Sequence, residues 1–137
     1  MPNSIYSHFV GIDVSKSNLD VFVSMTNSFF SFPNDPSGFN LLLKSISPSN
    51  DTLVLVDLTG GYENLLVNYL FSNGFNVHRA QGRKVRLFIS SYGQNAKSDK
   101  IDAKMLTIYG QKMQESLRLH QPSNNQLQEL ISRHQDI

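Results

Sequence analysis

Two aspartates stand at places in this sequence where acidic side chains are uncommon. Asp13 follows the run Val10-Gly11-Ile12, and Asp57 follows the apolar run 53–56. Burying an unpaired carboxylate is unfavourable, so acids are rare inside apolar strand segments. Both residues are predicted to end parallel strands, at the edge where open α/β sheets bind ligands. The alternative is that each aspartate only caps the turn that follows it.

A second pair of aspartates, Asp99 and Asp102, stands three residues apart at the start of a predicted helix. At this spacing two side chains share one helix face, with their Cβ atoms about 5–6 Å apart. Asp102 is also aligned with Leu106 and Tyr109, which indicates that the pair faces the apolar side of the helix. The simpler explanation is that acids in a first turn complement the helix dipole.

Taken together, the four aspartates predict one site that holds divalent cations. Several converging carboxylates would repel one another unless cations neutralised them, and oxygen-only ligands favour Mg²⁺ or Mn²⁺. Two such ions about 3.5–4 Å apart can activate a nucleophile and stabilise a leaving oxygen in phosphodiester chemistry. The chain has no cysteine and no His-x-x-x-His pair, which argues against zinc. The four histidines are predicted to be structural or surface residues: His8, His78, His120 and His134.

Basic residues gather in the second half of the chain. Seven of the twelve Lys and Arg residues lie between Arg79 and Lys104, against two acids. This local excess predicts either a solvated charged surface or a surface that binds a polyanion. The candidate contacts with DNA phosphates are Arg83, Lys84, Arg86, Lys97 and Lys100.

Composition limits the class of protein. A chain of 137 residues fits one domain of ordinary size, and 39% hydrophobic residues with a net charge of +1 argue against a disordered chain. No apolar run approaches the ~18 residues of a membrane span, and the N-terminus lacks the pattern of a secretory signal. The absence of cysteine excludes disulfides and thiolate chemistry. The cytoplasm is therefore the expected compartment.

The elements that would position these residues alternate between strands and helices. Apolar, β-branched segments predict strands at 8–14, 19–25, 28–32, 52–58 and 75–80. Helical spacing and caps predict helices after Asp35, at 62–72, at 83–91 and at 99–119, with a further helical start at 124–135. This order predicts an α/β fold in which a three-stranded meander is followed by two parallel strands with right-handed crossovers.

Four motifs resemble the DEDD transposases, a family that includes Piv-type DNA invertases and insertion-sequence recombinases. The motifs are GIDVSK at 11–16, LDV at 19–21, TGGYE at 59–63 and AKSDKIDA at 96–103, with Ser98 where the family has Thr. Each motif alone is weak, but their order and spacing are fairly specific. The resemblance covers about residues 8–120.

The resemblance implies a ribonuclease-H-like fold, similar to RuvC resolvases, with a mixed five-stranded sheet of order 3-2-1-4-5 flanked by helices. The family's acidic tetrad would fall on Asp13, Asp57, Asp99 and Asp102, which would act as catalytic ligands of Mg²⁺ or Mn²⁺. Asp57 stands where the family usually has Glu, so one ligand is shorter by a methylene. Residues 1–120 would be the catalytic domain, and 121–137 the start of a helical linker towards a C-terminal domain with a serine-bearing motif.

The implied activity is metal-dependent cleavage and joining of DNA strands in transposition or inversion, with branched or element-end DNA as the substrate. The full-length protein is expected to be a homo-oligomer, a guide RNA is a further candidate partner, and the fragment alone is expected to be inactive.

Two alternatives stay open. One is a non-catalytic remnant that binds DNA or oligomerises. The other is half of a sugar- or acetate-kinase-like ATPase, since those folds also open with a strand, an Asp and a small-residue turn. A test of metal binding distinguishes the recombinase from the non-catalytic remnant, and a test of nucleotide binding distinguishes it from the kinase-like ATPase.

Overall fold

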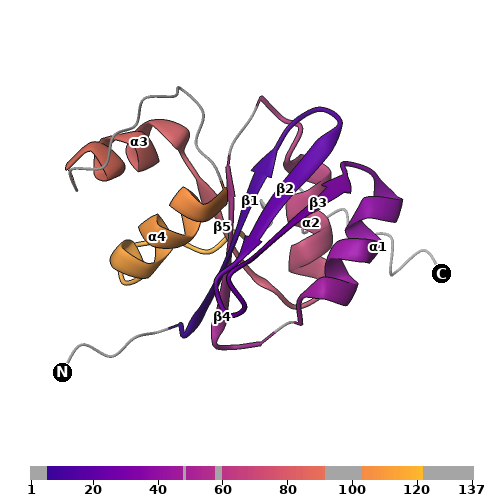
Figure 1. Cartoon of the computed structure of the whole chain (residues 1–137), viewed down its shortest axis with the longest axis horizontal. Coiled ribbons are helices and arrows are strands. Elements are labelled where there is room, and N and C mark those ends of the chain that lie inside the picture. Colours follow the sequence, from indigo (N-terminus) through magenta and orange to yellow (C-terminus); the bar gives the residue numbers. More distant parts are fainter. Residues whose placement is uncertain (1–5, 48, 58–59, 92–102, 122–137) are drawn as a thin grey trace.

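A central five-stranded sheet carries helices on both faces (Figure 1). The computed structural model describes residues 6–47, 49–57, 60–91 and 103–121. The strand order is β3-β2-β1-β4-β5. The β3-β2 and β2-β1 pairs are antiparallel, whereas β4 is parallel to both β1 and β5. This mixed sheet confirms the predicted ribonuclease-H-like architecture.

The elements follow the predicted order along the chain. The strands are β1 (His8–Val14), β2 (Asn18–Val23), β3 (Ser28–Pro33), β4 (Thr52–Asp57) and β5 (Asn76–Ala80). The helices are α1 (Pro36–Ser45), α2 (Asn64–Ser72), α3 (Gly82–Ser91) and α4 (Ala103–Met113). Within the described ranges, none of these helices has the length and apolar character needed to span a membrane.

Alternation along the strands divides the core into two layers. On β1, Val10, Ile12 and Val14 point to the side covered by α1 and α2, where they join a buried cluster with Leu42 of α1. Phe9 points to the opposite side, where the strands pack against α3 and α4. Because successive strand side chains point to opposite faces, this alternation also fixes which face each strand-end acid occupies.

Gly11 sets the distance between α4 and the sheet. A Cβ atom at Gly11 would overlap the backbone carbonyl oxygen of Ala103, the first residue of α4, and would lie 3.0 Å from Leu106 Cβ. The missing side chain therefore lets the start of α4 rest directly on the middle of β1.

The predicted helix 99–119 is wrong at its C-terminal end, because α4 ends at Met113. The chain then returns alongside β5, where the His120 amide donates to the Val77 carbonyl at 2.5 Å. Hydrogen bonds to a strand edge satisfy the backbone there in place of further helical turns. The start of this predicted helix, residues 99–102, lies outside the described residues, as does the predicted helical start at 124–135.

Two smaller differences concern element ends. β2 ends at Val23 rather than at Met25, because the chain turns over residues 24–27, where the Asn27 amide donates to the Ser24 carbonyl at 3.3 Å and Asn27 adopts a φ of 52°. α2 begins at Asn64 rather than at Tyr62, after Gly60 and Gly61, which both have positive φ.

Candidate metal centre and nucleic-acid interface

Asp13 and Asp57 lie on adjacent parallel strands at the same edge of the sheet. The β1–β4 register pairs Ile12 with Val56, and the two aspartates are the next residues on each strand. Adjacent strands are about 4.8 Å apart. Both side chains are on the α4 face, since Asp13 is two residues beyond Gly11 and Asp57 two beyond Leu55. They are 8% and 9% exposed, so both carboxylates are held in a largely buried environment.

Asp20 of β2 extends this pair into a row of three carboxylates. It lies directly opposite Asp13 in the antiparallel β1–β2 pairing, so the two side chains share one face. Asp20 is exposed, and its Oδ1 accepts a hydrogen bond from the Ser31 hydroxyl at 3.2 Å. Asp20 is not among the predicted site residues, although strand alternation in the sequence already separates it from Leu19 and Val21.

The other predicted site residues of this region lie outside the described residues. They are Asp99, Asp102, Lys97 and Lys100. In the described part of the chain, no group of three or more His, Asp or Glu side chains is arranged to hold a metal ion. The described chain resumes at Ala103, which rests on Gly11, two residues before Asp13 on the same strand.

Lys104 adds a positive charge near this row of acids. It is exposed in the first turn of α4, and its Nζ lies 5.9 Å from the ring centroid of Phe22, on β2. This is a cation–π distance, so the side chain is held over the sheet next to the strand that carries Asp20.

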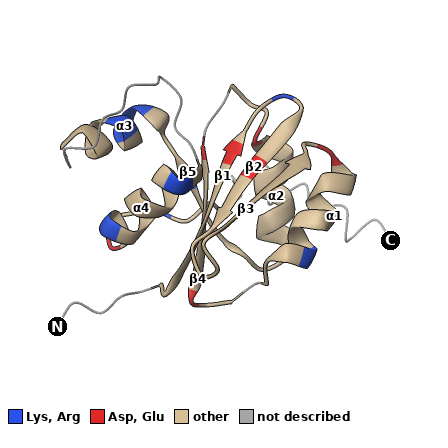
Figure 2. Ribbon diagram, viewed as in Figure 1, with Lys and Arg blue, Asp and Glu red and all other residues tan. Residues whose placement is uncertain are grey.

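The predicted basic residues of α3 lie at the same end of the sheet as the acids. In the β4–β5 register, Asp57 pairs with Ala80, and α3 begins two residues later. The helix buries Val85 and Ile89 and leaves its basic residues on the surface. These are Arg83, Lys84 and Arg86, all exposed. Figure 2 shows the basic α3 at the same end of the molecule as the acidic strand ends.

The segment after Asp57 is tied to β5 by a buried acid. Glu63 is only 3% exposed, and its Oε1 accepts a hydrogen bond from the Gly61 amide at 3.1 Å. Its Oε2 forms an ion pair of 3.0 Å with Nη2 of Arg79, which also donates to Asn64 Oδ1 at 3.1 Å. Arg79 directly precedes Ala80, the register partner of Asp57, so the pair links the start of α2 to the strand beside the candidate ligand. Glu63 belongs to the TGGYE motif, but its partner could not be identified from spacing.

Replacing Glu63 by Gln is expected to lower the free energy of unfolding by about 1–2 kcal/mol. The amide keeps an acceptor for Gly61 but removes the charge that faces Arg79. The loss is smaller than for a fully buried pair, because the Arg79 side chain is 38% exposed. Urea unfolding of Glu63→Gln beside Glu115→Gln, a control at an exposed acid, measures it. Equal midpoints for the two variants would show that the ion pair adds nothing to stability.

Two histidines lie at the β5 edge and have altered acidities. Burial lowers the pKa of His78, and the positive charge of nearby Lys84 lowers it further. A hydrogen bond to the Arg118 carbonyl, 2.6 Å away, acts in the opposite direction and raises the pKa. Burial also lowers the pKa of His120, and Arg79 contributes in the same direction. Both rings therefore favour the neutral form more than a solvated histidine does.

Comparison with known proteins gives the family. The model of the DEDD transposase family matches residues 10–137. The chain is also 28% identical over 123 residues to the pilin gene-inverting protein of Moraxella lacunata and to that of Moraxella bovis, a match that covers 85% of this chain. It spans 38% of the length of each of these relatives. The match favours the recombinase interpretation over the kinase-like alternative: the chain belongs to the DEDD transposase family.

Proposed function

We propose that this chain is the catalytic part of a metal-dependent DNA recombinase, in which Asp13, Asp57, Asp99 and Asp102 bind divalent metal. The observation that carries the proposal is the placement of Asp13 and Asp57 side by side at the carboxyl edge of two parallel strands, on the face covered by α4. Ligand sites of α/β sheets occur at this edge.

The start of α4 supports the inclusion of the other two acids. Asp102 is bonded directly to Ala103, whose carbonyl group packs on Gly11. Asp102 is thus one peptide unit, about 3.8 Å between Cα atoms, from a residue that packs on β1, the strand that bears Asp13. Asp99 is three residues earlier in the sequence, and we include it because it shares the predicted helix face with Asp102.

The charge of the row favours a bound cation. Like charges on directly opposite strand positions destabilise a sheet, and Asp20, Asp13 and Asp57 occupy three neighbouring strands. Carboxylate oxygens are the ligands that Mg²⁺ and Mn²⁺ prefer, so the donor set fits either metal. When bound, such ions polarise phosphodiester oxygens and lower the pKa of water. The carboxylates of this chain would orient the metals and keep the scissile phosphate at the sheet edge.

The exposed basic residues of α3 would hold the DNA beside this edge. Arg83, Lys84 and Arg86 project from a helix that starts next to the register partner of Asp57. Contacts of this kind bind the phosphate backbone and carry no sequence information. Lys97 and Lys100, from the segment before α4, are the remaining proposed phosphate contacts.

A titration with Mn²⁺ followed by amide NMR tests the metal site. Paramagnetic broadening is expected first at the amides around Asp13, Ala80 and Ala103. It is not expected at Lys44, which lies at the end of α1 on the opposite face of the sheet. Broadening should be lost in Asp13→Asn. Broadening centred elsewhere, or none at all, would favour the non-catalytic alternative.

DNA binding by the chain is expected to be weak, nearly independent of sequence and steeply reduced by salt. Each phosphate contact that is lost should lower the log–log salt slope by about 0.9 on duplex DNA. Arg83→Gln is therefore expected to reduce the slope by about 0.9, whereas Lys44→Gln, the same kind of charge loss at a remote site, should leave it unchanged. Fluorescence anisotropy at several salt concentrations measures both slopes. Salt-independent binding that discriminates between sequences would contradict this expectation.

A further inference from the structure

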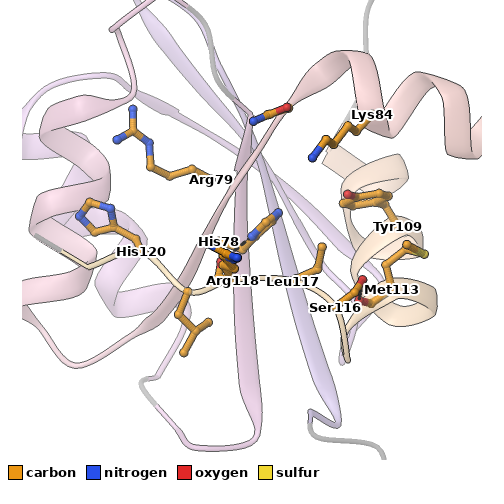
Figure 3. A pocket seen from close by; sticks show the side chains of 11 residues that line it. His78, Arg79, Lys84, Tyr109, Met113, Ser116, Leu117, Arg118 and His120 are labelled. Atoms are coloured by element: carbon orange, nitrogen blue, oxygen red, sulfur yellow. Dashed lines mark hydrogen bonds between the residues drawn. The ribbon is translucent and has the colours of Figure 1, made fainter. Parts of the chain in front are cut away.

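A pocket of about 500 Å³ lies at the outer edge of β5 (Figure 3), and none of the three aspartates of the row lines it. Its walls come from β5, the start of α3, the C-terminal half of α4 and the segment 116–120. In Figure 3, Tyr109 and Met113 line the α4 side, and Lys84 extends from α3 over the same space. A pocket of this volume is in the range that accommodates a nucleotide-sized ligand.

Long-range hydrogen bonds hold the segment 116–120, which forms one wall of the pocket, against β5. The His120 amide donates to the Val77 carbonyl at 2.5 Å, which fixes the returning segment along β5. His78 Nδ1 lies 2.6 Å from the Arg118 carbonyl, and the proton on this nitrogen makes the bond. Since burial lowers the pKa of His78, its ring adds no charge at neutral pH. The Arg118 backbone is thereby anchored while its exposed side chain faces the pocket.

The charged groups of the pocket are all cationic. Lys84, Arg118 and Arg79 line it, and no Asp or Glu is among the described residues of its walls. The charge of Arg79 is offset by Glu63. Lys84 and Arg118 have no ion-pair partner in the described part of the chain. Both side chains offer only hydrogen-bond donors, which suits the oxygens of a phosphate group.

Apolar side chains form the rest of the wall. Tyr109, Met113, Leu117 and Leu119 line the pocket beside the cations. Tyr109 packs against Phe88 in a T-shaped arrangement, with ring centroids 5.5 Å apart, and only 5% of Tyr109 is exposed. An apolar wall next to phosphate donors suits the two halves of a nucleotide, its base and its phosphate.

We propose that this pocket takes one unpaired nucleotide of a DNA strand, with its phosphate on Lys84 and Arg118 and its base against the apolar wall. This proposal rests on the proposed function, and it adds a second place where the chain contacts DNA. Gln81 of the pocket comes directly after Ala80, the register partner of Asp57, and Lys84, four residues after Ala80, also belongs to the basic surface of α3. The pocket is therefore continuous with the surface proposed to hold DNA, and a recessed pocket admits a splayed nucleotide rather than a paired one.

Binding of a short fluorescent oligothymidylate, measured by anisotropy at low salt in EDTA, tests the proposal. Arg118→Gln is expected to weaken binding about tenfold, as the loss of one charge-assisted hydrogen bond does. Arg118→Lys, which keeps the charge, should recover part of the affinity, and Lys44→Gln should change it less than about twofold. Because Arg118 and Lys44 are both exposed, each variant should keep the fold, which circular dichroism checks. Equal losses for Arg118→Gln and Lys44→Gln would overturn the proposal.

Two competitors and one local signal identify the occupant. Free thymidine monophosphate should displace the oligonucleotide only at far higher concentration; displacement at equal concentration would assign the pocket to free nucleotides and overturn the strand proposal. A blunt duplex should be much less sensitive to Arg118→Gln than the single strand, and equal sensitivity would contradict an unpaired nucleotide. The ring signals of His78 and Tyr109 should shift with oligonucleotide in the native chain, and the same shifts in Arg118→Gln should need about tenfold more oligonucleotide. Because these measurements are made in EDTA, they do not depend on metal binding. The proposed metal site can therefore be disproved while the pocket is still found to bind the oligonucleotide.

Discussion

Gly11→Ala is expected to lower the free energy of unfolding by about 3 kcal/mol, a large effect for the addition of one methyl group. The new Cβ would overlap the backbone carbonyl oxygen of Ala103 and would lie 3.0 Å from Leu106 Cβ. A helix backbone that already packs on the sheet cannot yield locally. The whole start of α4 would have to move away from β1, and the buried Leu106 would move with it.

Gly110→Ala is the matched control in the same helix. A Cβ there would meet the two terminal carbons of Leu55 at 2.7 and 2.9 Å, and a side-chain end can rotate away. Alanine also has a higher helix propensity than glycine by about 1 kcal/mol, which offsets part of the strain. The net change at Gly110 is therefore expected to stay within about 1 kcal/mol. Urea unfolding of the three proteins measures both effects, and equal losses at the two glycines would show that the contact with Ala103 is not rigid.

The same substitution links packing to the proposed metal site. Displacing the start of α4 from β1 would also displace the segment that carries Asp102, which is bonded to Ala103. Mn²⁺ affinity is therefore expected to fall in Gly11→Ala molecules that remain folded at low temperature, and to stay unchanged in Gly110→Ala. A native affinity in folded Gly11→Ala would indicate that the position of α4 does not govern the site.

The sheet could be predicted because its signals are local. The run His8–Val14, the turn after it and the alternation that follows gave β1 and β2 nearly to the residue. The rule that consecutive β-α units make parallel strands predicted their direction, and the strand order implied by the family resemblance placed Asp13 beside Asp57. The end of α4 could not be predicted, since Leu117 and Leu119 continue the helical spacing of apolar residues. It is the bond from His120 to Val77, across more than forty residues of sequence, that keeps this segment extended.

The features of the site that sequence reasoning missed all depend on pairing between distant residues. Glu63 could be recognised as part of a motif, but its ion pair with Arg79 requires knowing that α2 starts beside β5. Asp20 lies opposite Asp13 only through the hairpin register, which a shift of one residue would change. The pocket at the β5 edge likewise exists only because the chain after Met113 returns to that strand.

Asp57→Glu is expected to strengthen Mg²⁺ binding, because Asp57 is one methylene shorter than the Glu that the family resemblance implies at this position. Asp57 pairs with Ala80 on β5, and the residue before it, Val56, pairs with Ile12 on β1, so both neighbouring strands oppose a shift that would make up the difference. Mg²⁺ demands near-ideal octahedral geometry at about 2.0–2.1 Å, and a carboxylate that falls short is replaced by water rather than stretched. The longer side chain reaches about one C–C bond further, roughly 1.5 Å, from the same Cα.

Asp57→Asn should have the opposite effect, since it keeps the shape and removes a charge that offsets the charge of the metal. Thermal shift or calorimetry across a Mg²⁺ titration compares the native chain with both variants. A tenfold gain in affinity adds about 1.4 kcal/mol to the stabilisation by excess metal, enough to resolve. If Asp57→Glu binds no tighter than the native chain, the missing methylene does not limit the site. If Asp57→Asn also binds equally well, Asp57 is not a ligand and only caps the turn into Gly60, because removing the charge of a true ligand must weaken its hold on a divalent ion.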